Sequence, residues 1–168
     1  MLVEAAVLFP APADVVFEML SDSDYVSRKA TAMGALEHDV TVVDLGSGRT
    51  RIRLQRTLPS VVPDFVKPLV GPTIEVVQTE DWTAPGSDGA RRADLRAQIS
   101  AAPVSLSGQM TLQPTEDGTT IHRVEVTVRA KVPFLGGKIE RAIGEVLVLA
   151  ARKEEQVGAA WLAERRRG

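Results

Sequence analysis

The chain has 168 residues, of which 44% are hydrophobic, and its formal net charge at pH 7 is -2. This length and apolar content predict a single domain over residues 1–168 with a sizeable core. The balanced charge argues against a nucleic-acid partner, and no apolar run approaches the roughly 20 residues that a membrane-spanning helix needs. The absence of cysteine excludes disulfides and thiolate chemistry and suits a reducing cytosol, so we expect a cytoplasmic protein.

The first predicted elements are a strand and two short helices. Residues 2–9 alternate as in a half-buried strand, and they lack the basic leading region of a signal peptide. Pro12 suits the first turn of a helix, which the apolar spacing extends to Ser21. Ser21 and Asp24 resemble a capping box, which predicts a second short helix from Asp22 to about Gly34.

The middle of the chain is predicted to be an antiparallel meander. From residue 35 to residue 132 the apolar residues recur with a period of two, which indicates about six strands. Glycine-containing turns separate strands at residues 46–48, 85–89 and 117–118. Because apolar residues alternate with charged and hydroxyl residues, one face of the sheet should be dry and the other wet.

Residues 58–72 interrupt the meander with four prolines and an apolar set that includes Phe65 and Leu69. The spacing of this set is helical, but Pro68 would break a second turn, so we expect one short turn inside an apolar loop. Loops usually lie on the surface and are polar, so an apolar loop must cover something. It is either a cover over the core or a lid over a ligand cavity.

The last predicted element is a long amphipathic helix over residues 137–166. Its apolar residues recur at spacings of three, four and seven, and the charges take the other face. We expect residues 139–147 to cover a cavity. Residues 150–161, interrupted by Glu154 and Glu155, should pack against the first strand and the short helices. The apolar stripe comprises Ile139, Ile143, Val146, Leu147, Ala150, Val157 and Trp161.

A run of strands followed by a separate helix predicts an α+β fold, with the helix on the apolar face of a curved antiparallel sheet of about seven strands. Together with residues 12–17, 76–82 and 133–140, this order resembles the helix-grip fold of the START, polyketide cyclase and plant-allergen (SRPBCC) superfamily, and most of all a bacterial branch of unknown function. The resemblance covers nearly the whole chain and implies a hydrophobic cavity between sheet and helix. Superfamily members include lipid carriers, hormone receptors and cyclases, so it implies no single activity.

Several polar side chains fall in the apolar register of their predicted strands: His38, Gln78, Glu80 and His122. Burial raises the pKa of a carboxyl group and a nearby arginine lowers it, so Glu80 in a cleft is a candidate for orienting a ligand or for acid-base chemistry. Two alternatives stay open. Glu80 pairs with Arg56 or Arg91, which share its register, or a bulge near Thr79 turns it outward.

Neither a metal nor a cofactor is predicted. The two histidines lack the spacing of metal ligands, and Glu80 is the one imaginable third ligand for zinc. Hydrogen-bonded or edge histidines explain both residues more simply. The sequence contains no G-x-S-x-G nucleophile elbow and no G-x-G-x-x-G nucleotide loop.

These observations predict a noncatalytic protein that binds or carries a hydrophobic, lipid-like small molecule between sheet and helix. For Tyr25, packing against the long helix is an alternative to ligand binding. Two other functions stay open: an enzyme of cyclase, dehydratase or isomerase type with Glu80 or His122 as the acid or base, and a protein-interaction adaptor that uses the apolar loop. The oligomeric state is left open. The predicted walls are Phe65, Leu69, Met110, Ile143 and Leu147, with Tyr25 and Gln78 as polar anchors.

Overall fold

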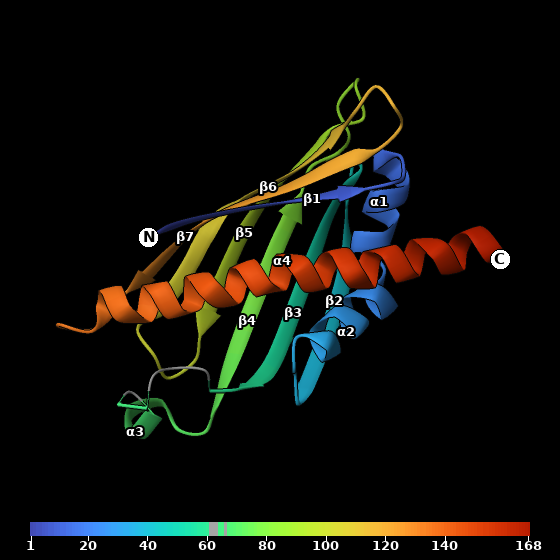
Figure 1. The fold of residues 1–168 in the computed structure, drawn as a ribbon. Helices are drawn as coiled ribbons and strands as arrows, with labels where there is room; N and C mark the ends of the chain where they lie inside the picture. The colour runs from blue at the N-terminus through green and yellow to red at the C-terminus, as the bar shows by residue number, and fades with distance from the viewer. Residues whose placement is uncertain (61–63, 66) are drawn as a thin grey trace.

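The computed structural model describes residues 1–60, 64–65 and 67–168, apart from the side chain of Leu69. In this part of the chain, one antiparallel sheet of seven strands is crossed by a long helix, which confirms the predicted α+β helix-grip fold (Figure 1). The strands are β1 (Leu2–Phe9), β2 (Glu37–Gly46), β3 (Arg49–Pro59), β4 (Thr73–Trp82), β5 (Arg91–Ile99), β6 (Val104–Pro114) and β7 (Thr120–Ala130). The helices are α1 (Ala13–Leu20), α2 (Ser23–Ala32), α3 (Lys67–Val70) and α4 (Gly136–Arg167).

The strand order is β1-β7-β6-β5-β4-β3-β2, so β1 and β2 form the two edges of the sheet. Strands β2 to β7 follow one another as the predicted meander. β1 closes the other side by pairing with β7, with Leu2 opposite Thr127 and Phe9 opposite Thr120. Between β3 and β4 the register is continuous, and Ile52 lies opposite Glu80. The bulge considered near Thr79 is therefore not formed.

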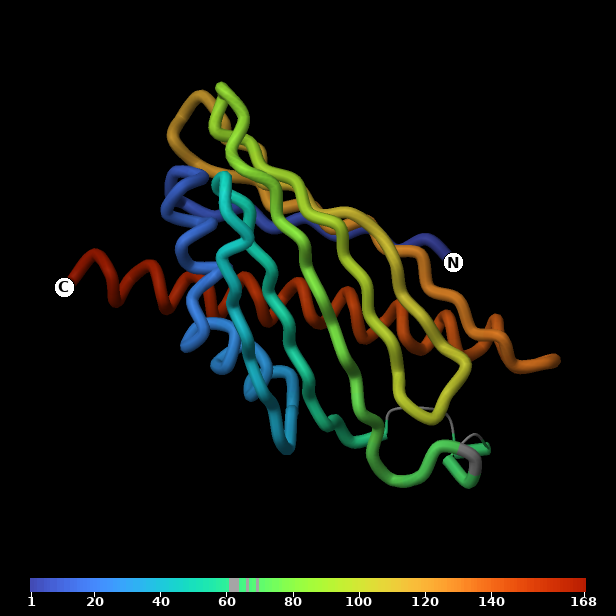
Figure 2. The backbone as a smooth tube through the Cα atoms, turned by 180° about the vertical axis from the view of Figure 1, so that it is seen from behind, coloured from blue at the N-terminus to red at the C-terminus, as the bar shows by residue number. Residues whose placement is uncertain are grey.

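Helix α4 runs across one face of the sheet, as the two opposite views show (Figures 1 and 2). Of the predicted apolar stripe, Ile139 is buried and the other members are half-buried. Glycines let the helix approach β1 closely, because a Cβ atom at Gly158 would lie 2.5 Å from the ring of Phe9. Four further residues of the helix are buried that were not part of the predicted stripe: Gly144, Glu154, Gly158 and Leu162.

The two short helices form after β1 as predicted, but the cap of α2 differs. The Asp22 carboxylate accepts a hydrogen bond from the backbone N–H of Tyr25 at 2.8 Å. The Ser21 hydroxyl instead donates to the carbonyl of Phe17 at 2.7 Å and closes the end of α1. The predicted capping box at Ser21 is therefore wrong by one residue, because Ser21 still belongs to the end of the preceding helix.

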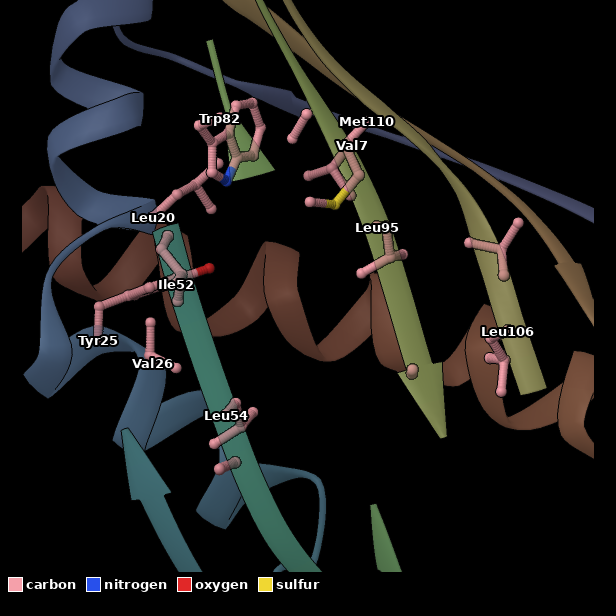
Figure 3. Close-up of a cluster of buried hydrophobic side chains, with 14 of the residues drawn as sticks. Val7, Leu20, Tyr25, Val26, Ile52, Leu54, Trp82, Leu95, Leu106 and Met110 are labelled. Atoms are coloured by element: carbon pink, nitrogen blue, oxygen red, sulfur yellow. The ribbon is translucent and has the colours of Figure 1, made fainter. Parts of the chain in front are cut away.

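The core lies between the sheet and helices α1, α2 and α4. Figure 3 shows side chains of α2, such as Tyr25 and Val26, and side chains of the strands, such as Ile52 and Leu95, pointing into this core. The opposite face of the sheet carries charges, including an ion pair between Arg51 and Asp81 at 2.6 Å. The predicted dry and wet faces are thus confirmed for these strands.

Strand β2 departs from the predicted pattern. His38 is exposed, and Val42 and Val43 are also largely exposed. His38 lies opposite the inward-pointing Arg56, so it has the predicted register, and it is exposed because β2 forms an edge of the sheet. This agrees with its interpretation as an edge histidine.

The apolar loop contains the single predicted turn, α3, and Pro68 is tolerated in its first turn. Val70 packs against the core. Phe65 is 49% exposed, and its ring centre lies 5.5 Å from the Lys138 Nζ at the start of α4. Residues 61–63 and 66 lie outside the described residues. No helix of the described part is long and apolar enough to cross a membrane.

Candidate functional site

A cavity of about 110 Å³ lies between the sheet and α4. Its two ends differ in chemistry. The apolar end is lined by residues from the sheet and from α4, including Leu95, Met110, Val126, Leu147 and Ala150. The polar end is lined by Lys29, Arg56, Gln78, Glu80 and Glu154.

Glu80 points inward from β4 and is 8% exposed. Its two oxygens accept hydrogen bonds from neutral donors: the Trp82 indole N–H donates to Oε2 at 2.9 Å, and the Gln78 amide donates to Oε1 at 2.7 Å. These three residues alternate along β4, so all three side chains lie on the core face. Glu80 is therefore a buried carboxylate that borders open space.

The expected pairing of Glu80 with arginine is wrong. Among the described residues, no cationic nitrogen lies within 4.0 Å of its carboxylate. Gln78 lies between Glu80 and Arg56 and bonds to both. Arg91 instead lies over the ring of Phe17 at 3.7 Å and donates to the carbonyl of Thr83 at 3.0 Å.

Arg56 points inward from β3 and lines the cavity. Its Nη2 donates to the Gln78 side-chain oxygen at 3.4 Å, a long hydrogen bond, and its buried Nε has no hydrogen-bond partner in the described part of the chain. Burial lowers the pKa of Arg56, and the negative charge of Glu80 partly offsets this effect. Within the described chain, the guanidinium group of this cavity-lining residue is therefore held by a single long hydrogen bond.

Glu154 is the buried carboxylate of α4 and is 8% exposed. Its Oε1 lies 3.1 Å from the His122 Nδ1 and 3.7 Å from the Lys29 Nζ. Burial acts to raise the pKa of Glu154, but the charges of Lys29 and His122 outweigh burial and lower this pKa to about 2. The carboxylate therefore joins α4 to α2 and β7.

His122 is 2% exposed. It approaches Glu154 closely enough for an ion pair when the imidazole is protonated. The angle is not that of a hydrogen bond, so neither ring nitrogen has such a partner among the described residues. Its ring also lies beside Trp82, with 6.2 Å between the ring centres. His122 supports Glu154 and does not line the cavity.

A second void of about 10 Å³ adjoins the polar end, which is room for roughly one water molecule. Lys29, Gln78, Glu80 and Glu154 line both spaces. The sheet and the helix thus present carboxylates to the same small volume.

Three of the predicted ligand-binding residues line the cavity: Gln78, Met110 and Leu147. Ile143 is half-buried and packs against the core outside the described lining. Phe65 lies beside the start of α4 and is also outside it. The side chain of Leu69 lies outside the described residues.

Tyr25 packs against the long helix α4, which was the alternative to a role in ligand binding. The side chain is fully buried, and its hydroxyl donates to the main-chain carbonyl of Glu154 at 3.5 Å. Burial, followed by the charges of Glu154 and Glu80, raises the pKa of Tyr25 above its ordinary value. Its hydroxyl remains protonated and holds α2 to α4.

The position of the cavity along α4 corrects the predicted division of this helix. The cavity lies under Leu147 to Glu154, so Leu147 is the one residue of the predicted stretch 139–147 in its described lining. Near the start of the helix, the space above Gly144 is filled by Met1 and Val3. Glu154 was interpreted as an interruption of the stripe, although it follows Leu147 by seven residues and precedes Gly158 by four. This spacing places it on the inner face and was the signal that the prediction missed.

A larger hollow of about 670 Å³ lies between β1 and the first half of α4. Most of its lining residues are exposed, including Glu4, Arg141, Glu145 and Arg152, so it is a surface groove. We place the candidate site in the smaller interior cavity, where buried polar groups converge. Within the described residues, no three potential ligands are arranged to hold a metal ion.

The seven-stranded sheet and the long helix that crosses it define a helix-grip fold. The fold is similar to that of the Zhui aromatase/cyclase from Streptomyces sp. R1128, with a TM-score of 0.59, 18% identity and coverage of 100% of this chain and 96% of that chain. It is also similar to the human StarD13 (DLC2) lipid transfer and protein localization domain, with a TM-score of 0.58, 14% identity and coverage of 93% and 76%. At these identities the likeness shows the fold alone.

By sequence, the chain belongs to the family described as "Protein of unknown function (DUF2505)", whose model matches residues 4–162. It is 31% identical over 112 residues to the uncharacterized protein Rv0481c of Mycobacterium tuberculosis. This match covers 66% of the chain and 64% of the relative, so it spans less than two thirds of the relative's length.

Proposed function

We propose that this protein binds a small amphipathic molecule in the cavity between the sheet and α4. The observation that carries the proposal is the division of this cavity into an apolar end and a buried polar end. Ligand pockets combine mostly apolar walls with a few converging polar groups, which is the arrangement here. The lipid-transfer and cyclase domains of similar fold support a ligand in this position.

The size of the cavity favours a ligand smaller than a membrane lipid. At about 110 Å³ it is well below the roughly 300 Å³ at which pockets for drug-sized ligands begin. It is closer to the roughly 150 Å³ of an engineered cavity that binds benzene. We therefore narrow the predicted lipid-like ligand to a molecule with about six carbons.

Hexan-1-ol is a suitable first probe, because it carries one polar group on a short apolar chain. Two-dimensional NMR of the ¹⁵N-labelled protein should show saturable shifts of the amides near Leu147 and Ala150. In Ala150→Leu, a larger side chain fills the cavity and the shifts should be lost. Ala159→Leu, on the exposed face of the same helix, is the matched control. Absence of saturable shifts in the wild type, or equal shifts in Ala150→Leu, would contradict the proposal.

The inward position of Glu80 supports a second candidate, an acid-base enzyme of isomerase or dehydratase type. Glu80 is buried, borders the cavity and is not neutralised by direct contact with a cation of the described chain. Such a carboxylate can accept a proton from a bound substrate. With cyclohexanone in deuterated buffer, the wild type should exchange the protons next to the carbonyl faster than Glu80→Gln does. Equal rates in both proteins and in buffer would remove this candidate.

A further inference from the structure

The acidic and basic side chains at the polar end of the cavity differ in how well they are satisfied. Glu80 accepts two hydrogen bonds of 2.7 and 2.9 Å. Arg56 makes one hydrogen bond of 3.4 Å, and its buried Nε has no partner among the described residues. Lys29 reaches Glu154 at 3.7 Å. A guanidinium carries five N–H donors, and the described chain supplies an acceptor for one of the Arg56 nitrogens, Nη2.

A buried N–H without a partner is costly, because it has left water without gaining an equivalent hydrogen bond, and the Arg56 Nε is in this position. A planar guanidinium matches a carboxylate, which accepts two parallel hydrogen bonds from it. The apolar end of the same cavity begins at Leu95, which lies opposite Glu80 on the neighbouring strand, and includes Leu147 and Ala150 of α4. A molecule that reaches both ends must therefore combine an acceptor group with a short hydrocarbon part.

Resting on the ligand-binding function proposed above, we infer that the ligand is a short-chain monocarboxylate. Its carboxylate accepts hydrogen bonds from Arg56, with Lys29 nearby, and its hydrocarbon part fills the apolar end of the cavity.

The charges around the cavity favour an anion over a cation. The formal charges of Lys29 and Arg56 balance those of Glu80 and Glu154, so the preference for an anion rests on which of these groups lack hydrogen-bond partners. A primary amine in the same position would place its charge against the unsatisfied guanidinium. Glu80 offers this amine little in return, because both of its oxygens already accept hydrogen bonds. The Glu154 Oε1 has no hydrogen-bond partner among the described residues, but it is buried and already lies beside Lys29 and His122.

Three ligands of equal chain length separate the contribution of the polar group from that of the hydrocarbon. Isothermal titration calorimetry of the wild-type protein with hexanoate, hexan-1-ol and hexylamine should show the tightest binding for hexanoate. Arg56→Gln should weaken hexanoate binding roughly ten- to hundredfold, the usual effect of losing hydrogen bonds to a charged group, and should leave hexan-1-ol little changed. Arg53→Gln is the control, because Arg53 lies on the same strand and bonds to Gln55 on the other face of the sheet.

The outcomes distinguish this inference from the function on which it rests. If hexan-1-ol or hexylamine binds as tightly as hexanoate, the carboxylate assignment is overturned and the ligand-binding function stands. If hexanoate binds Arg56→Gln as tightly as the wild type, Arg56 is not its receptor and the inference fails. If none of the three binds, both proposals fall. If Arg56→Gln does not fold, the comparison of the three ligands on the wild-type protein still tests whether a carboxylate is preferred.

Discussion

Glu154 shows how one buried side chain links distant parts of the chain. It lies on α4, and its carboxylate meets Lys29 of α2 and His122 of β7. The Tyr25 hydroxyl bonds to the main-chain carbonyl of the same residue. Removing one partner of a buried ion pair leaves the other charge uncompensated, which is usually more costly than the net contribution of the intact pair.

We expect Glu154→Ala to lower the free energy of unfolding at pH 7 by about 1–3 kcal/mol. This range is below the usual cost of breaking a fully buried pair, because the Lys29 side chain is 20% exposed and can reach solvent. Urea unfolding measures the change. Glu155→Ala, at the exposed neighbouring position, should stay within about 0.5 kcal/mol of the wild type, and an equal loss in both variants would contradict the assigned role.

The pH dependence of stability follows from the same residue. The pKa of Glu154 is about 2 in the folded protein, against an ordinary value of 4.5. Because the folded-state value is the lower one, the stabilisation is complete above pH 4.5 and is lost as the pH falls toward 2.

Between pH 5 and pH 2, the wild type should lose up to about 3 kcal/mol more unfolding free energy than Glu154→Gln. The variant keeps the other carboxyl groups with lowered pKa values, such as Asp81 beside Arg51, so the difference isolates Glu154. Urea unfolding at several pH values tests this. Parallel losses in the two proteins would show that another group is responsible.

At the scale of the elements, α4 depends on glycines that are not equivalent. A Cβ atom at Gly158 would lie 2.5 Å from the Phe9 ring and 3.2 Å from the Met19 Cε. Phe9 and Met19 are both buried in the core. At Gly144 the same atom would meet the flexible end of Met1, which can move aside.

Gly158→Ala should therefore destabilise the protein by about 1–3 kcal/mol, the usual cost of overpacking a core. Gly144→Ala should be neutral or stabilising by up to about 1 kcal/mol, because alanine favours the helix over glycine. Thermal unfolding of the two variants side by side measures the contrast. Equal midpoints would show that the helix shifts on β1 as readily at both positions.

Strand β6 depends on a glycine in a different way. A Cβ atom at Gly108 would overlap the main-chain carbonyl of Glu125 on β7, and backbone cannot move aside as a side chain does. Gly108→Ala should cost more than about 3 kcal/mol or prevent folding, whereas Ser107→Ala at the exposed neighbour should be tolerated. Circular dichroism and urea unfolding distinguish these results, and a normally stable Gly108→Ala would refute the close strand approach.

For the whole molecule, local patterns were enough to predict the elements and the fold class. Period-two alternation located the meander, and the spacing of apolar residues located the long helix. The same alternation correctly turned Glu80 and His122 inward. It also placed His38 on the same face as Arg56, its partner on β3, but it could not show that His38 is exposed, because the sequence does not reveal which strand forms the edge of the sheet.

The candidate site was predicted less completely, because it depends on contacts between distant residues. Glu154 has the charge of a surface residue, and only its approach to Lys29 and His122 explains its burial. Arg56 was expected to neutralise Glu80, but the intervening Gln78 separates them. The volume of the cavity depends on how closely α4 approaches the sheet. The glycines and alanines of α4 permit a close approach, but they do not fix the distance.

The pairing of β1 with β7 has a consequence for the time course of folding. Leu2 lies opposite Thr127, so the first strand gains its neighbour in the sheet only when the last strand, β7, is in place. Bringing the ends of so long a stretch of chain together lowers its entropy before the contacts between β1 and β7 can form, and this slows folding. During synthesis, the meander from β2 onward can assemble hairpin by hairpin, while β1 keeps both of its edges open until β7 emerges. The apolar side chains of β1 that belong to the core, such as Val7 and Phe9, stay uncovered for the same time.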